Sequence, residues 1–182
     1  MTHRTTDQGL RFIVCREAVV LQAYLDDTKG GDHYSIGPGS QMFHRLGEAS
    51  RPVAKGDRCT IEEALYMARI NCDERDRTLN NWLTTQIDPN QFDGVGSLFY
   101  QRGSKAAQAV IAWYNQHEPM WAAEEYIKWA SGQDGKKTRG HMHRRIEEMA
   151  VAALGYYGDL THFLLFDTDQ PRGKTGTLTP FP

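Results

Sequence analysis

Two carboxylates, Glu17 and Asp26, have the residue type and spacing that suit acid/base catalysis. Glu17 falls on a stripe of apolar residues at the helical period, with Ile13, Val14 and Leu21 three or four positions away. An ionised carboxylate on an apolar helix face is costly, so it must be paired, protonated or functional. Asp26 follows nine positions later, before a run rich in glycine. The sequence therefore indicates two acids with differently tuned pKa values.

Two acids in different surroundings are what a glycosidase uses. A carboxylic acid with apolar neighbours keeps its proton near neutral pH and can donate it to a glycosidic oxygen. A solvated carboxylate stays ionised, and it activates water or stabilises an oxocarbenium-like transition state. The spacing alone favours a structural alternative, in which Glu17 forms an ion pair and Asp26 ends a helix, because ion-pair networks also place acids on helix faces.

Charge, cysteine content and hydropathy exclude several classes of protein. The net charge of −2 gives no general attraction for nucleic acid, although residues 136–145 form one basic stretch. Cys15, Cys59 and Cys72 form no CxxC pair, and His141-Met-His143 lacks further ligands at metal-binding spacing. No apolar run approaches the roughly 20 residues that span a bilayer, and the N-terminus lacks an apolar signal segment. We therefore expect no metal, cofactor, nucleic acid or membrane span.

Amphipathic patterns and capping signals predict the elements that must position the two acids. A helix is expected over residues 7–24, with Thr6 or Asp7 as its N-cap, followed by turns and a small antiparallel sheet within residues 26–46. Thr60-Ile-Glu-Glu63 is a capping box that opens a long helix. After a break at Pro89 and Gly94, further helices are predicted over residues 95–101, 105–115, 119–131 and 141–154.

These elements predict an α+β fold that is dominated by helices, with one small β lobe. We expect a single catalytic domain over residues 1–158. Its β lobe would cover about residues 25–58, and its helical lobe about residues 7–24 and 59–155. Residues 159–182 read as a C-terminal tail that lies on the surface or is partly disordered.

The order of several motifs gives the chain a family resemblance. Glu17 and Asp26 are separated by eight residues, Tyr24 stands two positions before the aspartate, and Ser35-Ile36-Gly37-Pro38-Gly39 follows. Further along come Thr60-Ile-Glu-Glu-Ala64, Phe99-Tyr-Gln-Arg-Gly103, Ala122-Ala-Glu-Glu-Tyr-Ile-Lys-Trp129, Gly140 and Arg144-Arg145-x-x-Glu148. In this order, over about residues 9–154, the chain resembles the phage-type lysozymes of glycoside hydrolase family 24. The resemblance implies a lysozyme-like fold with an active-site cleft between its two lobes.

The resemblance also implies roles for individual residues. Glu17 would be the general acid, with a raised pKa that is moderated by the cation of Arg144 or Arg145. Asp26 would be the second carboxylate, and Ser35 would place the attacking water. Tyr24 and Gln101 would bind or support the substrate.

The chain departs from the family pattern after Asp26. The interval between Asp26 and the hydroxyl residue is three residues longer than usual, so Asp27 or Asp32 is an alternative second carboxylate. Ser35 replaces a threonine, Ser40 stands where the family often has histidine, and Met142 takes the place of leucine.

The implied activity is cleavage of the β-1,4 bond between N-acetylmuramic acid and N-acetylglucosamine in peptidoglycan glycan strands, as in a phage endolysin. We expect a monomer that is made in the host cytoplasm without a signal peptide and reaches the cell wall after holin-type or other release. Three alternatives stay open. They are a virion-associated or secretion-system muramidase, a non-catalytic peptidoglycan-binding module of the same fold, and an anion-binding protein that acts through residues 136–145.

Overall fold

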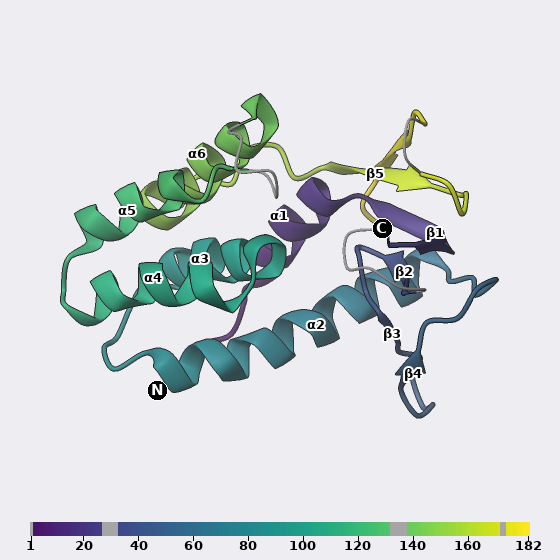
Figure 1. Cartoon of the computed structure of the whole chain (residues 1–182), viewed down its shortest axis with the longest axis horizontal. Helices are drawn as coiled ribbons and strands as arrows, with labels where there is room; N and C mark the ends of the chain where they lie inside the picture. The colour runs from purple at the N-terminus through teal and green to yellow at the C-terminus, as the bar shows by residue number, and fades with distance from the viewer. Residues whose placement is uncertain (1, 27–32, 132–137, 172–173) are drawn as a thin grey trace. The chain divides into compact units, whose positions relative to one another are not determined.

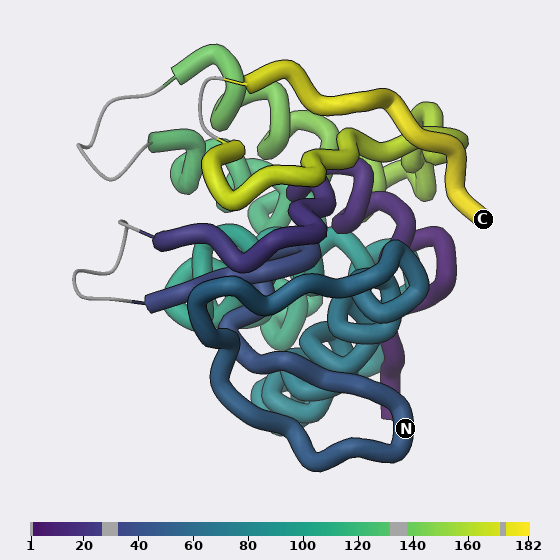
Figure 2. Tube along the Cα trace, turned by 90° about the vertical axis from the view of Figure 1, so that its right-hand side faces the viewer, coloured from purple at the N-terminus to yellow at the C-terminus, as the bar shows by residue number. Residues whose placement is uncertain are grey.

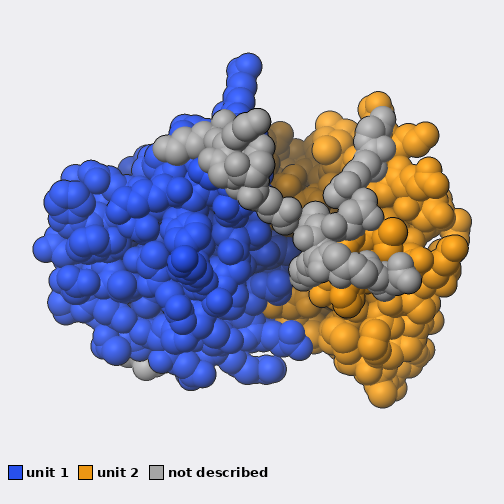
Figure 3. Space-filling view, in the orientation of Figure 1, with its two compact units in different colours: residues 1–13, 72–158 blue, residues 14–71, 159–182 orange. Residues whose placement is uncertain are grey.

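The computed structural model describes residues 2–26, 33–131, 138–171 and 174–182. The chain forms two compact units (Figure 3). Unit 1 contains Met1–Ile13 and Cys72–Gly158, and unit 2 contains Val14–Asn71 and Asp159–Pro182. Helices α1 (Asp7–Glu17) and α2 (Ile61–Trp82) each carry residues of both units.

In the main β-sheet of unit 2, β1 (Val19–Leu25) is an inner strand with a neighbour on each side (Figure 1). The strand order is β2-β1-β5-β6, with β2 at Tyr34–Gly37, β5 at His162–Phe166 and β6 at Thr177–Pro180. β2 is antiparallel to β1, while β5 is parallel to it. A separate two-stranded sheet pairs β3 (Met42–Phe43) with β4 (Arg51–Pro52).

The expected helix over residues 7–24 is therefore wrong in its second half. α1 ends at Glu17, and Ala18 adopts a left-handed conformation with φ of 61°, which stops the helix. The apolar residues of Val19–Leu25 fit the helical period, but they form a strand that is paired along both edges. Pairing with distant segments outweighs a local period that is compatible with either structure.

The expected C-terminal tail is also wrong, because residues after Gly158 form β5 and β6 of the main sheet. Figure 2 shows this segment, in yellow, returning beside the purple β1. Val19 and Val20 pair with Leu165 and Phe166, and Phe163 is 1% exposed. The segment thus contributes a buried aromatic side chain to unit 2.

Two predicted helix starts, those at Thr6 and Thr60, agree closely with the structure. Thr60 and Glu63 exchange the two hydrogen bonds of a capping box, Thr60 N to Glu63 Oε2 at 2.9 Å and Glu63 N to Thr60 Oγ1 at 3.2 Å. The Thr6 hydroxyl caps α1 by accepting a hydrogen bond from Gly9 N at 2.9 Å. Both predictions depended on residues within one turn of the helix start, and both are confirmed.

Unit 1 is a helical bundle of α3 (Pro89–Arg102), α4 (Ser104–Asn115), α5 (Pro119–Lys128) and α6 (Arg139–Leu154), together with the second half of α2. Aliphatic and aromatic side chains from these helices form its core, among them Leu79, Phe92, Leu98, Val110 and Tyr126. The predicted helices at 105–115 and 141–154 are confirmed within two residues of their bounds.

The break predicted at Pro89 and Gly94 is wrong, because α3 starts at Pro89 and continues through Gly94. Proline suits the first turn of a helix, where its missing N–H is not needed. Gly94 allows α3 to pack closely on α6, since a Cβ there would lie 2.8 Å from Cβ of Ala152 and 3.0 Å from the carbonyl oxygen of Glu148. Glycine at this position therefore serves packing rather than a turn.

Among the described residues, no helix has both the length and the apolar character required to cross a membrane.

Candidate active site

Glu17 is the last residue of α1 and lies in unit 2, directly before the left-handed Ala18. Its side chain is half-buried, and the preceding Ile13 and Val14 have no exposed surface. A non-glycine residue in the left-handed region is strained by about 1–2 kcal/mol, and such strain is often found at functional sites. The strained residue fixes the point where the chain leaves the helix, and so fixes the end position of Glu17.

Asp26 and Ser35 are in contact at the end of the β1–β2 pair where the chain leaves β1. The Ser35 hydroxyl donates a hydrogen bond to Oδ2 of Asp26 over 3.4 Å, and Asp26 N donates to the carbonyl oxygen of His33 at 2.8 Å. Ser35 has no exposed surface, while Asp26 is half-buried. The structure thus brings together the predicted second carboxylate and the predicted water-placing hydroxyl.

The sheet register also places Tyr24 on the face of this pair. Tyr24 and Ser35 are direct partners across β1 and β2, so their side chains point to the same face. Leu25 and Tyr34 form the next pair and point to the opposite face. A register irregularity between Val20 and Tyr24 bends β1 on its way from Glu17 to Asp26.

The alternative carboxylates Asp27 and Asp32 lie outside the described residues. Of the three, Asp26 is the carboxylate that the structure describes, and it accepts the hydrogen bond from Ser35.

The arginines of the closing motif form a buried cluster around Glu148 in unit 1. Arg145 Nε lies 2.7 Å from Glu148 Oε2, and Arg144 Nε donates to Glu148 Oε1 at 2.9 Å. Ser97 of α3 donates to the same carboxylate at 2.8 Å and accepts a hydrogen bond from Arg144 Nη2 at 3.0 Å. Burial lowers the pKa of the Arg145 guanidinium from its ordinary value, an effect that the carboxylate of Glu148 opposes.

Gln101 extends this cluster to the surface of unit 1. Arg145 Nη2 donates a hydrogen bond of 2.6 Å to Gln101 Oε1, so the exposed glutamine is held by a fully buried arginine. Glu17 belongs to unit 2, and its pairing with Arg144 or Arg145 stays a prediction.

The sequence did not single out Ser97, which lies 47 and 51 positions from its partners Arg144 and Glu148. A serine in the middle of a predominantly apolar helix was the only available signal. Within the described ranges, no group of three or more His, Cys, Asp or Glu side chains could hold a metal ion.

Solved structures with a similar backbone identify the fold. An endolysin from Escherichia coli O157:H7 phage FAHEc1 is 24% identical with a TM-score of 0.74, and the alignment covers 87% of this chain and 99% of that chain. The muramidase domain of SpmX from Asticaccaulis excentricus is 22% identical with a TM-score of 0.70, covering 83% and 98% of the two chains. A variant of P22 lysozyme is 22% identical with a TM-score of 0.68, covering 81% and 97%. The predicted helix-dominated α+β fold of the lysozyme type is thereby confirmed.

Family membership follows from the sequence match. A family profile described as phage lysozyme matches residues 15–148, which include Glu17, Asp26, Ser35 and the arginine cluster. The chain belongs to the phage lysozyme family. A comparison with curated protein sequences gives no significant match.

Proposed function

We propose that this protein is a muramidase that hydrolyses the β-1,4 bond between N-acetylmuramic acid and N-acetylglucosamine in peptidoglycan. Membership of the phage lysozyme family supports a peptidoglycan-cleaving glycosidase. The observation that carries the proposal is the hydrogen bond from Ser35 to Asp26. Both residues belong to unit 2, the unit that also contains Glu17.

In this proposal, Glu17 is the general acid. Its proton goes to the glycosidic oxygen as the bond to the sugar breaks and positive charge develops at the anomeric carbon. The apolar side chains that precede Glu17 favour its neutral form, since burial disfavours the charged carboxylate.

Asp26 and Ser35 act on the attacking water. A hydroxyl has one hydrogen to donate and two lone pairs that accept. Because Ser35 donates to Asp26, its lone pairs stay available for one hydrogen of a water molecule. The Asp26 carboxylate then accepts the other proton as the water attacks the anomeric carbon.

Gln101 is proposed as a substrate-binding residue. Arg145 holds its Oε1 atom, which directs the amide so that Nε2 is the group offered to a ligand. An amide N–H₂ can donate to the acetyl carbonyl or a hydroxyl of an N-acetylated sugar. Tyr24, on the face of β1 that carries Ser35, is a second residue proposed to support the substrate.

The decisive experiment is digestion of purified sacculi with mass analysis of the products. The wild-type chain should release fragments with reducing N-acetylmuramic acid ends. Glu17→Gln should abolish release while keeping the same unfolding transition, and the exposed control Glu48→Gln should retain full activity. Anhydro ends would indicate a lytic transglycosylase, free stem peptides an amidase, and binding without products a non-catalytic module; each result contradicts the proposal.

A second set of variants identifies the partner carboxylate. Asp26→Asn should reduce turnover as severely as Glu17→Gln, while Asp27→Asn and Asp32→Asn should retain most of it. An inactive Asp32→Asn beside an active Asp26→Asn would transfer the role to Asp32.

The biological setting proposed is that of an endolysin, which reaches the wall from the cytoplasm of the infected cell. A holin gene next to the gene for this chain would support the setting. Neighbouring tail or secretion genes would favour a virion-associated or secreted muramidase instead.

A further inference from the structure

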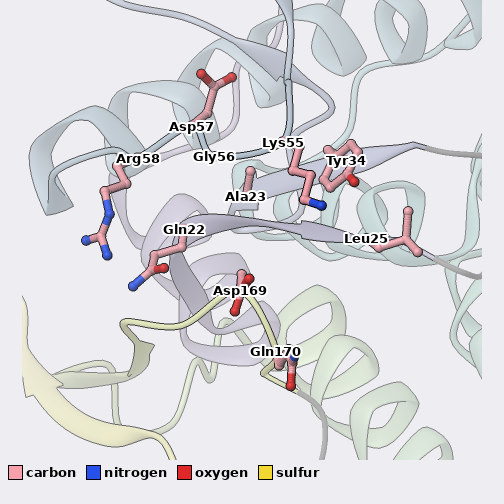
Figure 4. A pocket seen from close by; sticks show the side chains of 10 residues that line it. All are labelled: Gln22, Ala23, Leu25, Tyr34, Lys55, Gly56, Asp57, Arg58, Asp169 and Gln170. Atoms are coloured by element: carbon pink, nitrogen blue, oxygen red, sulfur yellow. The ribbon is translucent and has the colours of Figure 1, made fainter.

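Unit 2 contains a hollow of about 390 Å³ that the catalytic proposal does not use. It is lined by residues of β1 and β2, by the loop at residues 55–58 and by Asp169 and Gln170 from the segment after β5 (Figure 4). Its volume lies within the range of small-ligand pockets, which is about 300–1,000 Å³. The hollow is large enough for the end of a short peptide.

The hollow involves the face of the β1–β2 pair opposite to Asp26 and Ser35. Leu25 and Tyr34 line it, and their side chains point away from the face that carries Tyr24 and Ser35. A ligand held against Leu25 and Tyr34 therefore does not occupy the position of the scissile bond.

Two of the charged side chains around the hollow, Asp57 and Arg58, already have partners within the protein. Asp57 accepts hydrogen bonds from Arg51 at 2.7 and 2.9 Å and from Ala54 N at 2.8 Å, and in Figure 4 its carboxylate points away from the other labelled side chains. Arg58 lies 3.4 Å from Asp167, which also accepts a hydrogen bond from Gln22. These contacts hold the loop and the C-terminal segment in place.

Two other charges are available to a ligand. The Lys55 ammonium and the Asp169 carboxylate have no hydrogen bond or ion pair with any residue that the structure describes, and the same holds for the Tyr34 hydroxyl. In Figure 4, Lys55 and Tyr34 lie on one side of β1, while Asp169 and Gln170 lie on its other side. The hollow thus offers a cation and a phenol on one side and a carboxylate and an amide on the other.

We infer that this hollow binds the zwitterionic end of a peptidoglycan stem peptide, with a ligand carboxylate at Lys55 and a ligand ammonium at Asp169. The choice of peptidoglycan as the source rests on the proposed function. The glycan strand carries no free ammonium group, whereas a stem peptide with a diamino acid carries both charges. Charge-assisted hydrogen bonds to both groups would discriminate the peptide from a neutral sugar.

Part of the lining of this hollow comes from the C-terminal segment. Asp169 and Gln170 lie outside residues 15–148, which the family profile matches. A peptide contact on the reverse face of the β1–β2 pair would raise the affinity for peptide-bearing strands without touching the reacting atoms.

The test measures binding to the whole 182-residue chain carrying Glu17→Gln, so that turnover does not interfere. The probe is a synthetic tripeptide that ends in a 2,6-diaminodicarboxylic acid, and amide resonances such as that of Gly56 report its position. Lys55→Gln should weaken binding about tenfold, and Asp169→Asn should have an effect of similar size. The surface control Lys105→Gln, on α4 of unit 1, should leave the affinity unchanged.

Capped peptides assign each charge to its partner. Amidation of the tripeptide carboxylates should weaken its binding and remove the effect of Lys55→Gln, while N-acetylation should remove the effect of Asp169→Asn. The inference is overturned if the tripeptide does not bind, if it shifts resonances elsewhere, or if an N-acetylglucosamine tetramer displaces it from the hollow. Failure of the muramidase proposal is a separate observation, because wild-type chain would then leave sacculi intact while the tripeptide still bound.

Discussion

Arg145 Nε lies 2.7 Å from Glu148 Oε2, and neither side chain has any exposed surface. The same carboxylate also accepts hydrogen bonds from Arg144 and Ser97, so Glu148 contacts two buried guanidinium groups. Removal of one member of a buried ion pair leaves an uncompensated charge, which typically costs about 3–5 kcal/mol. The predicted result is that Glu148→Gln lowers the free energy of unfolding by about 3 kcal/mol or more.

Urea denaturation followed by circular dichroism measures this loss. Glu124→Gln, on the exposed side of α5, is the matched control and should change the free energy of unfolding by less than about 0.5 kcal/mol. A Glu148→Gln variant as stable as the control would show that the cluster is not an electrostatic support of unit 1.

Ser35→Ala tests the water-placing hydroxyl directly. The substitution removes the hydrogen bond to Asp26 and the lone pairs proposed to orient the water, so kcat should fall about tenfold or more with little change in KM. Ser40→Ala is a suitable control, because Ser40 is also buried but donates to a backbone carbonyl, that of Met42, at 2.6 Å. Equal effects of the two variants on kcat would contradict the water-placing role and leave Ser35 with a structural role.

The C-terminal strands are expected to stabilise unit 2. Phe163 of β5 is 1% exposed and packs against Phe181, with the rings tilted and their centroids 4.9 Å apart. Phe163→Ala should lower the free energy of unfolding by about 3–5 kcal/mol. Leu178→Ala on the neighbouring β6 should cost far less, since Leu178 is 64% exposed. Thermal or urea unfolding of both variants measures the two losses in free energy of unfolding. Similar losses would contradict a structural role for β5.

Features that depend on a few neighbouring residues could be predicted from the sequence. The Thr60–Glu63 capping box and the helix start at Thr6 are such features, because donor and acceptor lie within one turn. The Arg144–Glu148 contact also follows from helical spacing, since residues four apart share a face.

Features that depend on distant pairing could not be predicted. Val19–Leu25 is compatible with a helix until β2 and β5 are placed on its two edges, and β5 lies more than 140 positions further along the chain. Gly94 suggests a turn until Ala152 and Glu148 are placed against it. In the candidate site, the contact of Ser35 with Asp26 was expected only through the family resemblance, whereas the hollow behind Leu25 needed the C-terminal segment.

The Asp57 carboxylate gives the loop beside the hollow a pH-dependent anchor. The hydrogen bonds from Arg51 hold the pKa of Asp57 below its ordinary value of 3.8, with a smaller contribution in the same direction from the backbone N–H of Ala54. A group whose pKa is lowered by folding stabilises the native state above its unfolded pKa, and this contribution is lost as the pH falls through the lowered value. Wild type should therefore be more stable than Asp57→Asn by a constant amount between pH 7 and pH 5, and the difference should shrink progressively below about pH 4.

Urea titrations of wild type and Asp57→Asn across this pH range measure the difference in free energy of unfolding. A gap that stayed the same down to pH 2 would mean that the charge of Asp57 does not support the loop, and a gap that widened on acidification would reverse the sign of the assigned pKa shift.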